Sequence, residues 1–496
     1  MTDGKGGGAR GARGAHNESG ETRVEKDGIG EMVLPGDALY GLESARAREN
    51  FSLDYRPVNM RLVYAMVKIK KAAAITFGKA AGASADNGEA EKFRAIAGAC
   101  DRILTSPPAG LSEVFITDAL QGGAGTSVHM NVNEALANIA LDILGKKPGC
   151  YDVVHPLNDV NRFQSTNDVY PTALRIAAIE ALRELAEECA KFQEVLQKKE
   201  TEYGDIAKLG RTELMDAVPV TLGGEFGAYA QAAARDRWRL YKVEERLRQI
   251  NLGGAAAGLA EAEGGKEDVH ERRQYRFGVI EELRTITGIG LAAAEYPMDL
   301  TQNNDVFVEV SGLLKALAVN LSKIAGDIRL MNSGPRGGLG EIRLAPLQKG
   351  STIMAGKVNP VIPEMVIQAG IKVMANDSAI SIAASRGEFE LNAFSPLIAD
   401  SLLESISLLR RTCFLFRVKC LERLTPDRER CAELLDASWA FAASFVPALG
   451  YETVSRIIAE HQNNQEGNRQ AARPADGTAE KIRRALEEAA VRAGNG

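Results

Sequence analysis

The chain has 496 residues, and 45% of them are hydrophobic, which is enough apolar material for a large core and more than one domain. Its 60 basic and 66 acidic residues leave a net charge of −6, which argues against general nucleic-acid binding but permits an anionic substrate held by local positive charge. The sequence contains no apolar run of membrane-spanning length, and residues 1–24 lack the apolar core of a secretory signal, so we expect neither feature.

The cysteines and histidines argue for a reduced, metal-free protein. The six cysteines include no CxxC pair, and several fall on apolar helix stripes, so we expect free thiols in a cytoplasmic protein. The five histidines are scattered without metal-ligand spacing, so we expect no metal site.

In chain order, the first segment is a polar tail followed by a helical domain. Residues 1–24 are dominated by Gly, Arg, Ala, Ser and Glu, a composition that predicts disorder. Helical spacing of apolar residues then predicts helices over about 59–77 and 89–104, and a third that ends near Gly145. We therefore predict an N-terminal helical domain over 25–165.

The longest helical patterns follow. Gln164–Asp168 is a polar cluster before Pro171, which signals a helix start. Apolar stripes continue to Leu196 and recur in further helices, whereas residues 253–273 read as a loop or insertion. These helices are expected over about 222–250, 306–331, 361–384 and 397–423. We predict a central domain over 166–421 and a small C-terminal helical domain with a polar tail over 422–496, including a short helix over 480–492.

These patterns define the fold class. Helices of nearly thirty residues exceed the usual three or four turns, and strand-like alternation is almost absent. We predict an all-α protein with three domains, built on a central bundle of about five long antiparallel helices. The broad apolar stripes predict an oligomer.

Helix length also constrains any shared site. A helix of 30 residues is about 45 Å long. Ser165–Asn167 precede such a helix, and Thr212–Glu213 lie beyond its far end. If both groups serve one active site, they must come from different subunits.

One loop, Gly350–Pro360, combines the chemistry of an anion site. Its glycines permit unusual backbone angles and close access to a ligand, and Pro360 suits the first turn of the following helix. A helix N-terminus favours anions, and Lys357 adds a full positive charge. An ordinary glycine-rich connector is the alternative interpretation.

Five motifs, taken together, resemble a known family. They are GGAGTS (122–127), QSTND (164–168), GRTE (210–213), SGPR (333–336) and GSTIMAGKVNP (350–360). In this order they resemble the aspartase/fumarase superfamily, and within it the aspartate ammonia-lyases, over about residues 24–462. The resemblance implies a homotetramer with a central helical core, active sites shared by three subunits, and reversible anti-elimination of ammonia from an amino-dicarboxylate without metal or organic cofactor.

The resemblance also implies residue roles. Ser351 would be the catalytic base, and Lys357, Asn359 and Thr352 would bind substrate from the same loop. The other substrate-binding positions would be Thr126, Ser165, Thr166 and Asn167, with Thr212 and Glu213 facing the leaving amine. His129 and Met215 are possible specificity positions. Structural alternatives stay open: Thr126 could cap a helix, Ser165 and Asn167 could form an N-cap pair, Lys357 could be a surface charge, and Glu213 could sit in a salt bridge.

Several positions depart from the pattern of aspartate ammonia-lyases. Glu213 stands where Gln or His is usual, Met215 where Gln is usual, His129 where Asn is usual, and Ala355 where Pro is usual. The leading hypothesis is a carbon–nitrogen lyase that converts L-aspartate to fumarate and ammonia through an aci-carboxylate. The alternative is a lyase of the same superfamily acting on an N-substituted or larger amine substrate. A fumarate hydratase and a catalytically silent member rank below these.

Overall fold

The computed structural model describes residues 20–83, 87–106, 110–259, 266–463 and 478–494. It is dominated by helices, with only short two-stranded sheets among the described residues, so the all-α prediction is confirmed. The chain forms two compact units: residues 1–177, 248–303 and 386–400 make the first, and residues 178–247, 304–385 and 401–496 the second. Among the described residues, no helix is both long and apolar enough to span a bilayer.

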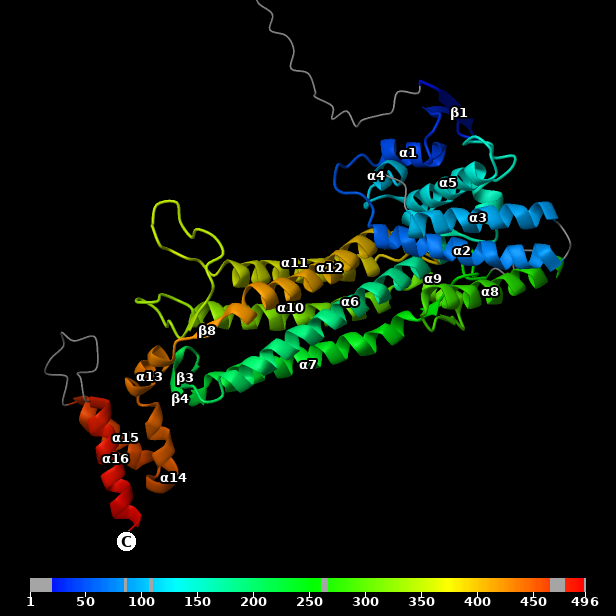
Figure 1. Cartoon of the computed structure of the whole chain (residues 1–496). Coiled ribbons are helices and arrows are strands. Elements are labelled where there is room, and N and C mark those ends of the chain that lie inside the picture. Colours follow the sequence, from blue (N-terminus) through cyan, green and yellow to red (C-terminus); the bar gives the residue numbers. More distant parts are fainter. Residues whose placement is uncertain (1–19, 84–86, 107–109, 260–265, 464–477, 495–496) are drawn as a thin grey trace, which may run out of the picture. The chain divides into compact units, whose positions relative to one another are not determined.

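The first unit is organised around three helices, α2, α3 and α5, which lie side by side (Figure 1). They are mostly apolar inside, and the α2 stripe includes the buried Val63, Met66 and Ile69. The elements of this unit are β1 (Thr22–Lys26), β2 (Glu31–Pro35), α1 (Leu42–Asn50), α2 (Met60–Ala83), α3 (Asn87–Thr105), α4 (Leu111–Val114), α5 (Thr126–Ile143), the π-helical turn Pro156–Val160, β5 (Gln249–Ile250), α8 (Lys266–Thr287), β6 (Ala292–Ala293) and α9 (Pro297–Gln302).

The second unit contains a bundle of long helices. Two long helices, α6 (Thr166–Glu202) and α12 (Ser395–Lys419), begin in the first unit and continue here, and three more lie within the second unit: α7 (Leu222–Leu247), α10 (Asp305–Met331) and α11 (Val361–Ala384). The predicted number of about five long helices is therefore confirmed.

Apolar packing and buried polar pairs tie this bundle together. The Sγ atoms of Cys189 on α6 and Cys413 on α12 lie 4.0 Å apart among buried leucines and phenylalanines. Ser311 of α10 donates to Asp377 of α11 at 2.8 Å, and Tyr229 of α7 donates to Asp327 of α10 at 2.8 Å. All six cysteines are free in this structure.

The remaining elements of the second unit are short. They are β3 (Ala207–Thr212), β4 (Met215–Thr221), β7 (Ile342–Arg343), β8 (Thr425–Pro426), α13 (Arg428–Asp436), α14 (Val446–Leu449), α15 (Tyr451–Asn463) and α16 (Thr478–Gly494). The last helices have an apolar core of their own, which includes Val454, Ile482 and Leu486.

Two local predictions need correction. The tail predicted to be disordered up to residue 24 overlaps strand β1, because Thr22–Lys26 pairs in register with Glu31–Pro35; residues 1–19 lie outside the described residues. The segment predicted as a loop over 253–273 includes the start of α8 at Lys266. The boundaries at 165/166 and 421/422 stay predictions.

Candidate active site

Three of the predicted site residues lie at the start of α6: Ser165 directly before the helix, and Thr166 and Asn167 in its first turn. Ser165 Oγ accepts a hydrogen bond from the Asn167 backbone N–H at 3.2 Å, and Asp168 Oδ1 accepts one from the Ser165 N–H at 3.0 Å. The capping role considered for Ser165 is therefore real. It does not use up the side chain, because the hydroxyl hydrogen of Ser165 is still free to be donated to an anion at this helix N-terminus.

Residues 251–256 are hydrogen-bonded to this turn, and a proline in the sequence of α6 explains one of these bonds. Pro171 lies inside α6 and has no N–H for the carbonyl four residues earlier. That carbonyl, on Asn167, accepts instead from Asn251 Nδ2 at 2.9 Å. Asn167 Nδ2 in turn donates one of its two hydrogens to the Ala256 carbonyl at 2.8 Å, which leaves the second amide hydrogen for a ligand.

Asp168 completes this attachment from a fully buried position. Its Oδ2 accepts hydrogen bonds from the N–H groups of Gly253 at 3.0 Å and Ala255 at 3.2 Å. Burial raises the pKa of Asp168 to about 7, although these backbone N–H donors oppose the shift. The carboxylate therefore orders both the α6 N-terminus and the adjacent segment.

His129 is buried on α5 and bridges two polar groups. Its Nδ1 lies 2.8 Å from Thr166 Oγ1, and its Nε2 lies 2.7 Å from Lys70 Nζ. Lys70, on α2, also donates to Asn161 Oδ1 at 2.7 Å. Burial, and then the charge of Lys70, lower the pKa of His129 well below its usual value, so the imidazole is neutral.

The glycine-rich turn before α5 places Thr126 one helical turn from His129. Gly125 has φ +96°, and a Cβ there would lie 2.2 Å from the Tyr170 ring of α6, so only glycine permits this approach. Thr126 is exposed, and its hydroxyl donates to the Gly123 carbonyl at 2.7 Å. The first unit thus gathers five predicted site residues around the starts of α5 and α6: Thr126, His129, Ser165, Thr166 and Asn167.

Three other predicted residues lie on the β3–β4 hairpin of the second unit. Thr212 pairs with Met215 across a two-residue turn. Both turn residues, Glu213 and Leu214, have positive φ, at 55° and 65°, which is the signature of a type I′ turn. Glu213 is exposed, and within the described residues it forms no salt bridge, so the structure gives no support to the salt-bridge alternative.

Buried charges anchor the base of this hairpin. Glu341 is fully buried and pairs with Arg211 at 2.8 Å and with Lys208 at 3.0 Å. Lys208 also binds Glu225 of α7 at 2.8 Å. Because a buried charge is costly unless paired, these contacts hold the hairpin base in one arrangement while its tip stays exposed.

The loop that carries Ser351 is closed by its own backbone and by Asn359. Gly350 N–H donates to the Lys357 carbonyl at 2.9 Å, and Asn359 Nδ2 donates to the Gly350 carbonyl at 2.8 Å. Ser351 Oγ accepts from the N–H groups of Ile353 at 3.2 Å and Met354 at 3.0 Å. Two backbone donors at this oxygen favour its anionic form. Thr352 and Lys357 are exposed on the same loop.

The predicted site residues therefore form three groups within one protomer: the α5–α6 group in the first unit, and the hairpin tip and the Ser351 loop in the second. Helix α6 alone has 37 residues, about 55 Å at 1.5 Å per residue, between Thr166 and its last turn. Sequence reasoning missed Lys70, Asn251 and Asp168 as members of the α5–α6 group. Three sequence signals point to them: the lysine pair before the alanines of α2, the last residue of the QSTND motif, and the missing N–H of Pro171.

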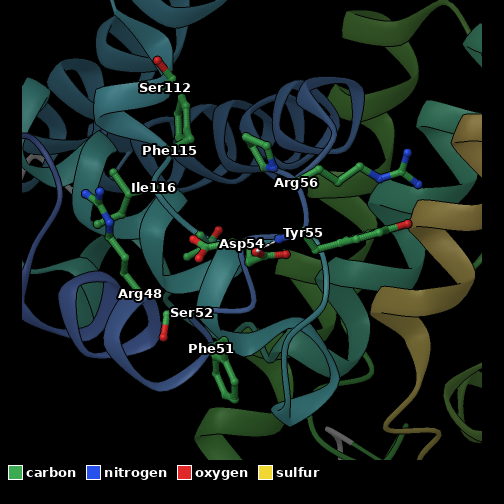
Figure 2. Close-up of a pocket in the computed structure, with 12 residues that line it drawn as sticks. Arg48, Phe51, Ser52, Asp54, Tyr55, Arg56, Ser112, Phe115 and Ile116 are labelled. Carbon is green, nitrogen blue, oxygen red and sulfur yellow. Dashed lines mark hydrogen bonds between the residues drawn. The ribbon is translucent and has the colours of Figure 1, made fainter. Parts of the chain in front are cut away.

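A separate pocket lies in the first unit, beside the segment between α1 and α2. Its volume is about 450 Å³, and Figure 2 shows Tyr55 and Arg56 extending together away from Arg48. Arg56 Nε donates to Asp400 Oδ1 at 2.8 Å, so its charge is neutralised. None of the predicted site residues lines this pocket.

Comparisons with known proteins agree with the motifs. A family model described as "Lyase" matches residues 30–375. The chain is similar to an aspartate ammonia-lyase of Pseudomonas aeruginosa, with 41% identity over 88% of this chain and 89% of that protein. Its structure is similar to a fumarate lyase:delta crystallin of Brucella melitensis, with TM-score 0.81 and 39% identity over 95% of this chain and 100% of that one.

A more distant similarity extends to a class II fumarase of Schistosoma mansoni, with TM-score 0.81 and 28% identity over 95% of each chain. The family model matches well over half of the chain. The alignment with the Pseudomonas aeruginosa protein also covers 89% of that protein's length. On this evidence the chain belongs to the lyase family of the aspartase/fumarase superfamily and is a carbon–nitrogen lyase of the ammonia-lyase class.

Proposed function

We propose that this enzyme catalyses the reversible anti-elimination of ammonia from L-aspartate to give fumarate. The observation that carries the proposal is the α6 N-terminus, where Ser165 has its oxygen satisfied by the Asn167 N–H and keeps a hydroxyl hydrogen for an anion. A helix N-terminus with free hydroxyl donors is suited to a substrate carboxylate. Relatives named aspartate ammonia-lyase, similar over almost the entire chain, support the same substrate.

The reaction needs a base and a site for developing negative charge. In the proposed mechanism, the Ser351 alkoxide removes a proton from the carbon next to one carboxylate, and the electron pair moves into that carboxylate as an aci-carboxylate. The pair then returns to form the carbon–carbon double bond while the carbon–nitrogen bond breaks and ammonia leaves with its electrons. Hydroxyl donors from Ser165 and Thr166 and the second amide hydrogen of Asn167 would stabilise the intermediate, and Thr126 would join them once its hydroxyl turns away from the Gly123 carbonyl.

Lys357 and Asn359 would bind the other carboxylate. The backbone donors at Ser351 Oγ support its role as base, because they make its deprotonated form less costly. Thr352 would add a hydroxyl from the same exposed loop. Closure of this loop over substrate would exclude water.

A complete site requires more than one subunit in this proposal. The Ser165–Asn167 group opens α6, and the Thr212–Glu213 hairpin follows its end, so one protomer cannot offer both to a small dicarboxylate. We therefore propose a homotetramer with active sites shared by three subunits. The exposed apolar side chains at the hairpin tip, Leu214 at 75% and Met215 at 69%, support a contact with another copy. We place the enzyme in the cytoplasm because its six thiols are free.

The second candidate function is elimination from an N-substituted or larger amine substrate. It is favoured by Glu213, an exposed carboxylate at the position expected to face the leaving amine, where a positively charged amine would be attracted. Fumarate hydration and a catalytically silent role rank lower, because Ser351, Lys357 and Asn359 are all present in a preformed loop.

The test is a direct assay of fumarate by its ultraviolet absorbance, with L-aspartate, L-malate and a panel of N-substituted aspartates as separate substrates. Turnover of L-aspartate at an ordinary enzymatic rate, without turnover of malate, supports the leading function. Turnover of a substituted amine alone would replace it with the second candidate. Fumarate from malate alone would identify a hydratase.

A further inference from the structure

Lys70, His129 and Thr166 form a continuous line of hydrogen-bonding side chains from three helices. The Lys70 Nζ to His129 Nε2 distance is 2.7 Å, and the His129 Nδ1 to Thr166 Oγ1 distance is 2.8 Å. Lys70 and His129 are each only 1% exposed, so water cannot replace either partner. Thr166 is half-buried and stands at the end of this line, in the first turn of α6.

The chemistry of the three groups gives the line a direction. An ammonium group has three donors and no acceptor, so a charged Lys70 must donate to His129 Nε2. A neutral imidazole carries one proton, which must then lie on Nδ1. His129 Nδ1–H therefore donates to Thr166 Oγ1, and the Thr166 hydroxyl hydrogen is turned away from the histidine.

We infer that Lys70 and His129 are positioning residues that direct the Thr166 hydroxyl to donate to the substrate carboxylate. The inference rests on the proposed function for the identity of the anion, whereas the direction of the hydrogen bonds follows from a charged Lys70 and a neutral His129. Asn161 Oδ1, which accepts from Lys70 at 2.7 Å, fixes the ammonium position.

This direction holds while Lys70 carries its proton. Burial lowers the pKa of Lys70 to about 7, and the Asp168 carboxylate of α6 and the Cys100 thiol of α3 act against that shift. His129 is kept neutral by burial and by Lys70. If Lys70 loses its proton, its lone pair can accept from Nε2–H, and the line can reverse so that Thr166 donates to Nδ1 and is lost as a donor to substrate.

A double-mutant cycle tests the inference through activity. Thr166→Val removes the hydroxyl at nearly constant volume and is expected to lower kcat about 100-fold, the cost of one donor at a developing oxyanion. Lys70→Met is expected to lower kcat about 10-fold with little change in KM. If Lys70 acts through the Thr166 hydroxyl, the double variant will be no slower than Thr166→Val. The inference would be overturned if the loss in kcat of the double variant equalled the product of the two single losses, or if Lys70→Met kept full activity.

Lys71→Met is the matched control. Lys71 is the next residue of α2, but its Nζ pairs with Asp101 at 2.6 Å near the surface, so this variant should keep wild-type kcat. Thermal unfolding and oligomeric mass are measured for every variant, and a comparison counts only between variants that match wild type in both. Absence of any lyase activity in the wild type would refute the proposed function, but it would not test the direction of the hydrogen bonds between Lys70, His129 and Thr166.

A second measurement therefore detects the direction of the hydrogen bonds between Lys70, His129 and Thr166 directly. The chain has five histidines, so magic-angle-spinning NMR of protein labelled with [15N]histidine can resolve the two ring nitrogens of His129, assigned by its loss in His129→Asn. We expect the proton on Nδ1 in wild type and a mixture of tautomers in Lys70→Met. A proton on Nε2 in wild type, or the same spectrum in wild type and Lys70→Met, would refute the positioning role of Lys70 and His129, whether or not the protein shows lyase activity.

Discussion

Asn359 closes the loop that carries Ser351, because its side-chain Nδ2 donates to the Gly350 carbonyl oxygen at 2.8 Å. A second bond, from Gly350 N–H to the Lys357 carbonyl, makes the closure two-sided. The proposed base and the proposed carboxylate-binding residues are thus held in one loop by contacts that need no partner.

Gly350→Ala should damage this loop severely. A Cβ at position 350 would lie 2.3 Å from the Lys357 carbonyl oxygen, so the loop cannot close without moving. We expect kcat to fall about 100-fold, the usual cost of a displacement of about 1 Å in a catalytic group, with little change in the unfolding temperature. Gly356→Ala is the control in the same loop: nothing lies within 4 Å of its Cβ, and the cost is only the strain of φ +80°, about 1 kcal/mol. Equal losses in the two variants would contradict the steric argument.

Ser351→Ala should remove the base and leave the fold intact. The expected loss in kcat is about 10²- to 10⁴-fold, the range for a lost general base. Ser351 is half-buried in an exposed loop, so the unfolding temperature should stay close to that of wild type. Steady-state kinetics of fumarate release and thermal unfolding check both expectations. Unchanged kcat would remove Ser351 from the mechanism.

The amphipathic helices could be predicted from the sequence, because an apolar stripe repeated over several turns reports burial on one face. Contacts between segments far apart in the sequence could not be predicted in this way. Lys70 meets His129 across 59 positions, and nothing local marks either residue as the other's partner. The turn at Glu213 and Leu214 also escaped prediction, because neither residue is the Asn or Gly that a type I′ turn normally shows.

Pro171 illustrates the intermediate case. The proline was visible as a helix-start signal, but α6 begins earlier, at Thr166, and the proline lies inside it. Its missing N–H frees the Asn167 carbonyl, which Asn251 then occupies. The pattern could predict an unsatisfied carbonyl but not which residue, 84 positions later, would satisfy it.

Asp168→Ala should destabilise the first unit. Three backbone N–H groups, on Ser165, Gly253 and Ala255, would lose their acceptor in a buried position. We expect a loss of about 3–5 kcal/mol in the free energy of unfolding, as for a broken buried charge network. Asp142→Ala, which removes an exposed carboxylate paired with Arg102, should change stability by no more than about 0.5 kcal/mol. Similar denaturation curves for the two variants would show that Asp168 does not hold the segment.

Glu134 should make stability fall as pH rises. This buried residue accepts from the N–H groups of Gly41 at 2.8 Å and Glu43 at 2.9 Å, and burial raises its pKa from 4.5 to about 7. Between these values the folded state binds a proton that the unfolded state does not, so this stabilisation is complete below pH 4.5 and is lost as pH rises through 7. Each unit of pKa shift is worth about 1.4 kcal/mol. Unfolding temperatures measured from pH 5 to pH 8 should fall less steeply for Glu134→Gln, and parallel curves would contradict this origin.

Leu214 should report on assembly. Its side chain is 75% exposed in the protomer, and its φ of 65° strains any residue with a branched apolar side chain. Leu214→Asn removes the apolar side chain but keeps a residue that tolerates a left-handed backbone, so the turn itself should be preserved or relaxed.

If another subunit covers the tip, the variant loses about 1.5–3 kcal/mol of apolar burial for each copy. We expect light scattering at decreasing concentration to show dissociation earlier than in wild type, with fumarate release falling in parallel, because Thr212 and Glu213 would leave the shared site. An unchanged mass together with unchanged activity would mean that the tip faces solvent, and the proposal of sites completed by this hairpin would be wrong.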